Sequence, residues 1–175
     1  MFCVLVYYCE HCKEQNTIIM KTTDVINPLS YSEIKSIYNQ LDYIGLDNDE
    51  IRQAIDHLSN YDSNDFESGN YRLIITEDID EIMQDELESD EYILGCFNSW
   101  FISDSCDIDI EVVEALQESD KYDVLGRLIL KSGNLKELQS EYVRLDGYGH
   151  HFNHYDGNQW ELNANNTIYH VFKIG

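Results

Sequence analysis

Residues 75–91, ITEDIDEIMQDELESDE, restrict the fold of this chain more than any other stretch, because they combine a helical apolar pattern with very dense negative charge. Nine of the seventeen residues are acidic and none is basic. Apolar residues recur at helical spacing, at Ile79, Ile82, Met83 and Leu87. That spacing predicts an amphipathic helix with one face against a core. A chain that folds around such a helix must leave much of its acidic set on the outside.

The charge imbalance extends well beyond this helix. Between Arg72 and Lys121 there are sixteen acidic residues and no lysine or arginine. The whole chain of 175 residues has 34 acids against 11 bases, and its formal charge is −23. Such a charge repels nucleic acid and anionic membranes and attracts basic surfaces. We therefore expect no direct nucleic-acid binding and no membrane association, and a basic protein as partner.

Composition nevertheless indicates a folded protein. Hydrophobic residues make up 43% of the chain and aromatic residues 12%, which is too much for a disordered acidic tail. We expect a single compact domain over residues 1–175, with a soft boundary near 60–70. No apolar run reaches transmembrane length, no signal peptide is evident, and five cysteines fit a reducing compartment. These features favour a cytoplasmic protein.

Apolar runs predict strands near both ends of the chain and helices between them. The predicted strands are 3–8, 16–22, 71–76, 159–163 and 167–174. The predicted helices are 31–45, 47–59, 77–91, 107–119, 121–133 and 134–147. Asp47 and Glu50 have the spacing of a capping box. The pattern indicates an α+β fold, in which a helical middle packs on short antiparallel strands from the N- and C-terminal ends.

Three further segments have no clear helical or strand period. Residues 59–70 and 146–158 are rich in polar residues and glycine, so both are predicted as loops. Residues 92–103, YILGCFNSWFIS, are nearly all apolar and are expected to be the most buried segment of the protein.

The acidic residues on the predicted helices form the candidate binding surface. Carboxylates one helical turn apart lie about 5–6 Å from each other at Cβ, and each like-charge pair costs a helix roughly 0.2–0.5 kcal/mol. Selection for stability alone would not accumulate such pairs, whereas a row of carboxylates can imitate the phosphates of duplex DNA. The alternative is an ordinary solvated surface. The predicted partner-binding residues are Glu77, Asp78, Glu81, Asp85, Glu88, Asp107, Glu111 and Glu114.

In composition, the whole chain resembles the small acidic anti-restriction and anti-CRISPR proteins of phages and plasmids. The C-terminal segment DGYGHHFNHYDGNQWEL also resembles the tails of phage and plasmid proteins. The resemblance implies a DNA mimic without catalytic activity that evades host defence through protein–protein interaction in the host cytoplasm. It implies inhibition of a nuclease or methyltransferase of restriction–modification, of a CRISPR effector or of another defence nuclease. A monomer and a homodimer both stay open.

Two clusters leave other functions open. Cys9 and Cys12 form a C-x-x-C, half of a structural zinc site, which would make the protein a zinc-stabilised interaction domain with an ordinary acidic surface. The other half could come from His150, His151 or His154. The alternative for the cysteines is a pair of reduced thiols, and no other cofactor is expected. The histidines could instead belong to a metal-dependent hydrolase, although Gly147 and Gly149 argue against a helix there and favour a loop.

Overall fold

The computed structural model describes residues 29–60 and 64–175. The helices within these ranges are α1 (Tyr31–Ile44), α2 (Asn48–Asn60), α3 (Ile79–Ser89), α4 (Glu91–Cys96), α5 (Ser99–Cys106), α6 (Ile110–Glu118), α7 (Tyr122–Ser132) and α8 (Leu135–Phe152). The strands are β1 (Asp65–Ser68), β2 (Tyr71–Ile75), β3 (Trp160–Ala164) and β4 (Thr167–Lys173). No helix in these two ranges has the length and apolar character needed to cross a membrane.

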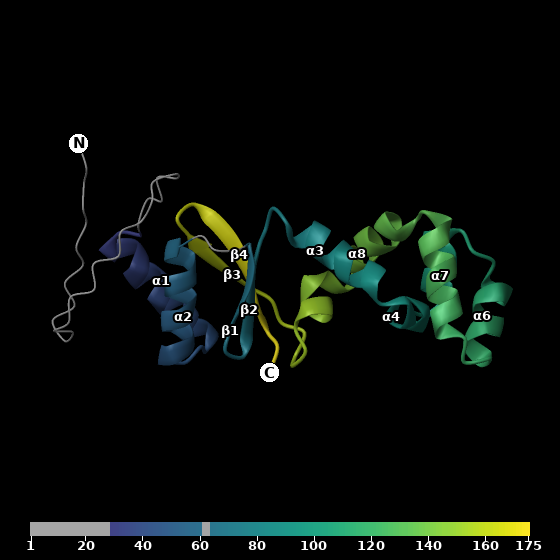
Figure 1. Cartoon of the computed structure of the whole chain (residues 1–175), viewed down its shortest axis with the longest axis horizontal. Helices are drawn as coiled ribbons and strands as arrows, with labels where there is room; N and C mark the ends of the chain where they lie inside the picture. The colour runs from purple at the N-terminus through teal and green to yellow at the C-terminus, as the bar shows by residue number, and fades with distance from the viewer. Residues whose placement is uncertain (1–28, 61–63) are drawn as a thin grey trace.

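The four strands form one antiparallel sheet in the order β1-β2-β4-β3, so the C-terminal hairpin pairs with a strand from the first half of the chain. Alternation along β2 gives the sheet two buried faces. Leu73 lies in a core with α1 and α2, whereas Ile74 lies in a second core with α3–α8. The molecule is elongated, with α1 and α2 at one end, the sheet next to them and the helices beyond it (Figure 1). We call α1, α2 and β1–β4 the sheet half, and α3–α8 the helical half.

Local signals fix the ends of the first two helices. A capping box at Ser30 begins α1, and Gly45, in the left-handed conformation with φ 109°, ends it. Before α2, the Asp47 carboxylate accepts the Glu50 N–H at 2.9 Å, and the Glu50 carboxylate accepts the Asp47 N–H at 2.8 Å. The predicted capping box is therefore confirmed.

In the helical half, α4 and α7 approach unusually closely. A Cβ on Gly126 would lie 1.8 Å from the Glu91 carbonyl oxygen, and one on Gly95 would lie 2.0 Å from the Tyr122 carbonyl oxygen. Only glycine fits where two helix backbones meet at such a distance. The pair fixes the orientation of α4, which follows directly from the acidic helix α3.

The predicted α+β class is confirmed, with a helical middle and an antiparallel sheet built from N-side and C-terminal strands. The predicted strands at 71–76, 159–163 and 167–174 are present, and the helices predicted over 31–45, 47–59, 77–91, 107–119, 121–133 and 134–147 are present with shifted ends. The predicted strands at 3–8 and 16–22 lie outside the described residues.

Three local predictions are wrong. Residues 65–68 form the edge strand β1, which its polar sequence hides because pairing with β2 stabilises it. Residues 92–103 are not uniformly buried, since they form two short helices that each bury one face, and the side chain of Trp100 is 66% exposed. Helix α8 runs on to Phe152, because the non-helical break at Gly147 is followed by another helical turn.

Candidate functional site: the acidic surface

The acidic residues of 75–91 fall into two groups, of which the first is bound within the fold. Asp80 accepts hydrogen bonds from the Gln139 amide through its backbone carbonyl, at 2.8 Å, and from the Tyr148 hydroxyl through its carboxylate, at 2.7 Å. Asp90 caps α4 by accepting the Ile93 N–H at 2.9 Å. Both acids therefore help to position helices within the fold.

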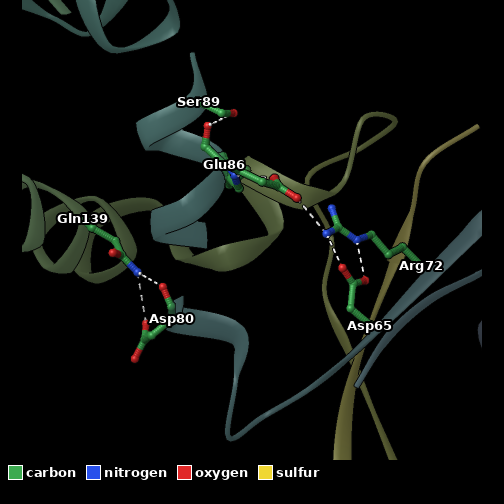
Figure 2. A network of polar contacts seen from close by, with 7 residues as sticks. Asp65, Arg72, Asp80, Glu86, Ser89 and Gln139 are labelled. Carbon is green, nitrogen blue, oxygen red and sulfur yellow. Dashed lines mark hydrogen bonds and ion pairs between the residues drawn. The ribbon is translucent and has the colours of Figure 1, made fainter. Parts of the chain in front are cut away.

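Glu86 belongs to the same group and connects the two halves of the molecule. Arg72 on β2 makes two hydrogen bonds of 2.7 Å to the Asp65 carboxylate and a 2.7 Å ion pair with Glu86 on α3 (Figure 2). His151 Nε2 lies 3.0 Å from the other Glu86 carboxylate oxygen. The Arg72 guanidinium also lies 5.1 Å from the centre of the Phe152 ring. This network holds α3 against the sheet.

The network shifts the ionisation of its members. Burial of the Glu86 carboxyl raises its pKa, but hydrogen bonds from His151 and Arg72 act in the opposite direction and prevail, so the pKa lies below its ordinary value. The hydrogen bond to Asp65 raises the pKa of Arg72, which stays charged under all ordinary conditions. Arg72 on the sheet and Glu86 on α3 are therefore both charged and paired with each other at this junction.

The second group points away from the core of α3. Glu77, Glu81, Asp85 and Glu88 are exposed, and Asp78 is half-buried at the start of the helix, where its carboxylate accepts a hydrogen bond from the Asn64 amide. Within the described ranges no lysine, arginine or histidine forms an ion pair with any of these five. These are the five residues that the sequence singles out for partner binding around α3; Glu77 lies in the turn before the helix, Asp78 is its N-cap residue, and the other three lie within it.

An open hollow of about 350 Å³ lies beside this group. Its lining residues are Asn64, Asp65, Asp78, Glu81, Ile82 and Asp85. A hollow with several carboxylates and one apolar wall can accept the charged head of a lysine or arginine side chain. The exposed face of α3 thus has a hollow as well as negative charge.

The other three predicted residues lie at a distance from α3. Asp107 ends α5 in the left-handed conformation with φ 53°, and Glu111 and Glu114 are exposed on α6. Helix α6 lies at the far end of the helical half, and α4, α7 and α8 lie between it and the sheet half (Figure 1). The acids therefore form two separate groups along the long axis, the α3 group (Glu77, Asp78, Glu81, Asp85 and Glu88) and the α5–α6 group (Asp107, Glu111 and Glu114).

All four arginines of the chain pair with acids of the chain. Besides Arg72, Arg127 on α7 binds Glu91 at 2.8 Å and Asp123 at 3.1 Å. Arg52 pairs with Asp49, and Arg144 with Glu141. None of these four side chains has its ion pair in the α3 group or the α5–α6 group. An arginine that pairs with either group must therefore come from another molecule.

The histidines do not converge on one point. His150 is exposed and meets the Tyr142 ring edge-on at 6.0 Å, His151 pairs with Glu86, and His154 is exposed with its backbone N–H donating to the Lys173 carbonyl at 3.0 Å. In the part of the chain that the structure describes, no three His, Cys, Asp or Glu side chains form a metal-ligand group. Cys9 and Cys12 lie outside that part, so the zinc prediction stays a prediction.

Sequence reasoning missed the junction network. Arg72 shares a strand face with Ile74, and this alternation places its side chain toward the helical half. Alternation alone does not say that Glu86, rather than another acid of α3, meets it. Glu86 lies three residues after Met83 and seven after Ile79, so helical spacing places it beside the buried stripe of α3.

Comparisons of the chain with protein-family models, with curated proteins and with solved structures find no match.

Proposed function

We propose that this protein is an acidic inhibitor from a phage or another mobile element, which occupies a basic nucleic-acid-binding surface of a host defence enzyme. The α3 group would contact lysines and arginines that otherwise hold phosphates, and the α5–α6 group would extend the contact along the long axis. The function is binding, not catalysis, and the target is a restriction–modification enzyme or a CRISPR effector.

The observation that carries this proposal is the distribution of cations. Every arginine pairs with acids of the same chain, namely Asp49, Asp65, Glu86, Glu91, Asp123 and Glu141. The α3 and α5–α6 groups have no such partner within the described ranges. An isolated exposed ion pair contributes at most about 1 kcal/mol, so the missing pairs cost little stability. They leave a negative field for a basic partner, which such a field attracts over distance.

The shape of the molecule supports the same proposal. The acids lie on folded helices that packing holds in place, so their spacing is set before binding, and less conformational entropy is lost on association. Helices α3 and α6, which carry acids of the two groups, lie at opposite ends of the elongated helical half (Figure 1). A basic cleft that follows a nucleic-acid backbone also extends along one direction.

The test begins with immobilised protein and a lysate of a bacterial host that carries restriction and CRISPR systems. Retained proteins are eluted with rising salt and, separately, with duplex DNA, and those released by both are identified. We then measure the affinity of the identified target for a variant with Glu77→Gln, Glu81→Gln, Asp85→Asn and Glu88→Gln. We expect weaker binding at unchanged or higher melting temperature, because neutralisation removes repulsion on α3. Asp78 is left intact because it binds Asn64.

A matched control removes the same charge from the sheet half, with Asp42→Asn, Asp56→Asn, Glu67→Gln and Glu161→Gln. All four residues are exposed and none forms an ion pair within the described ranges. We expect this variant to bind the target much as the unmodified protein does. Equal loss in both variants, or target binding that responds neither to salt nor to DNA, would show that the α3 acids are an ordinary solvated surface.

A further inference from the structure

The exposed face of α5 carries a tryptophan next to an acid. Trp100 is 66% exposed and Asp104 is also exposed, one turn later on the same helix. At 3.6 residues per turn the two side chains are about 40° apart around the helix axis, and each is about 160° from Ile102, which is fully buried. Both therefore project together from the outermost side of α5.

The Asn98 side chain fixes the start of this helix by accepting the Trp100 N–H at 2.9 Å. Trp100 thus begins a capped helix rather than a loose loop. Within the described ranges no aromatic ring packs on Trp100, and Asp104 has no ion pair. The α5–α6 group of acids follows directly after Asp104 in the chain. Aromatic residues are enriched in protein interfaces relative to the rest of a protein surface, and Trp100 places one beside an exposed carboxylate.

The protein itself shows what such a pair of groups can hold. Arg72 lies over the Phe152 ring at 5.1 Å while carboxylates of Asp65 and Glu86 bind its guanidinium edge at 2.7 Å. An arginine stacks on a ring with its flat face and binds carboxylate with its edge, so one side chain satisfies both contacts. Trp100 and Asp104 offer the same two groups, and tryptophan is the strongest ring for this contact.

We infer that Trp100 and Asp104 form an arginine-binding pair on α5, which takes a guanidinium from the basic partner between the indole face and the carboxylate. The inference rests on the proposed function, because it adds the kind of side chain that the partner contributes. Lysine fits less well, since its compact ammonium group is strongly hydrated and has no flat face to stack. The acids alone attract any cation, whereas this pair selects arginine.

The test uses two peptides of equal length and charge, one of arginine and glycine and one of lysine and glycine. Affinities are measured by titration calorimetry at low and at raised salt, together with the tryptophan emission. We expect tighter binding of the arginine peptide and a change in emission that disappears in Trp100→Leu. This substitution should lower the affinity for the arginine peptide about two- to fivefold and leave the lysine peptide nearly unaffected.

Two further variants separate the pair from general effects. Asp104→Asn should lower arginine-peptide affinity, and the double variant should lose less than the product of the two single losses, because both groups hold one guanidinium. Tyr31→Leu is the matched control, since Tyr31 is 82% exposed on α1 and the residue one turn later is Lys35, a cation. We expect it to leave both affinities unchanged.

The outcomes distinguish the two proposals. If both peptides bind equally and lose affinity with salt, in the unmodified protein and in Trp100→Leu alike, the arginine-binding pair is wrong and the acidic inhibitor stands. If neither peptide binds at low salt, both proposals fail. Because Trp100 is exposed, circular dichroism of Trp100→Leu should match that of the unmodified protein.

Discussion

The sheet half and the helical half both have a buried core, but within the described residues only the sheet half buries an acidic side chain, Glu50. In the sheet half the buried Glu50 carboxylate accepts the N–H groups of Asp47 and Asn70, at 2.8 and 2.9 Å. In the helical half the acids of the α5–α6 group stand in solvent without an ion pair in the described ranges. Where the fold buries a carboxylate it supplies backbone donors, whereas the exposed acids of the α5–α6 group need none because water solvates them.

The junction between the two halves combines apolar packing with a network of charged side chains. Phe152 at the end of α8 is buried, its ring lies 5.1 Å from that of Phe172 on β4, and the Arg72 guanidinium lies 5.1 Å from the centre of the Phe152 ring. Ile74 and Phe172 belong to the core of the helical half although they lie in the sheet. The two halves should therefore unfold together.

The largest expected effect comes from breaking this junction. Phe152→Ala should lower the free energy of unfolding by about 3–5 kcal/mol, because it leaves a cavity where the halves meet and removes the ring beneath Arg72. Denaturant unfolding followed by circular dichroism measures the loss. Tyr43→Ala, at a side chain that is 88% exposed, is the control and should stay within about 0.5 kcal/mol. Equal losses in the two variants would show that Phe152 does not join the halves.

A smaller effect is expected inside the helical half alone. Gly126→Ala should destabilise the protein by about 1–3 kcal/mol, since the new Cβ meets the Glu91 carbonyl oxygen and pushes α4 from α7. The higher helix propensity of alanine offsets part of this loss, by up to about 1 kcal/mol. Gly133→Asn is the control, because that site is open and asparagine tolerates its left-handed backbone. A stabilised Gly126→Ala protein would contradict the close helix contact.

The comparison between bound and free acids can be tested on α3 itself. Glu86→Gln should cost about 1–2 kcal/mol, since it weakens the ion pair with Arg72 at a half-buried site. Glu81→Gln, on the same helix and with the same chemical change, should alter stability by less than about 0.5 kcal/mol. Chemical denaturation of both variants measures the difference. If the two substitutions have equal effects, the division of the acids into two groups is wrong.

The smallest effect concerns pH at the junction. Burial lowers the pKa of His170, whose Nδ1 lies 2.9 Å from the Gln159 amide nitrogen, and the nearby Glu161 opposes that shift. The unfolded chain therefore binds a proton at higher pH than the folded protein does. Stability should fall as the pH drops below 6.5, the ordinary histidine value, and level off below the folded pKa.

The measurement compares the unmodified protein with His170→Asn, because protonation of the many carboxylates changes stability in both proteins alike. The difference between their unfolding free energies should shrink as the pH falls through this range. A difference that stays constant with pH would show that His170 titrates alike in the folded and unfolded chain. The pKa of Glu86 is also lowered, so this group too should make stability fall with falling pH, but only below about 4.5, the ordinary glutamate value.

Periodicity and caps in the sequence were enough to predict most of the local structure. The stripe of Ile79, Met83 and Leu87 is buried as its spacing predicts, and the glycines at 45 and 133 end helices in the left-handed conformation. The exposure of Glu81 and Asp85 follows from the same stripe, because residues opposite a buried face must meet solvent. These features depend on neighbours within a few residues, which the sequence alone contains.

Tertiary structure decided what local patterns do not contain. The polar strand β1 exists because β2 pairs with it, and the orientation of α4 depends on its close contact with α7 through Gly95 and Gly126. The choice of Glu86 as the acid that meets Arg72 depends on how α3 lies on the sheet. Charge and periodicity in the sequence determined that most of these acids would be exposed. Long-range packing determined which of them form ion pairs within the fold, because an ion pair needs two side chains brought to one place.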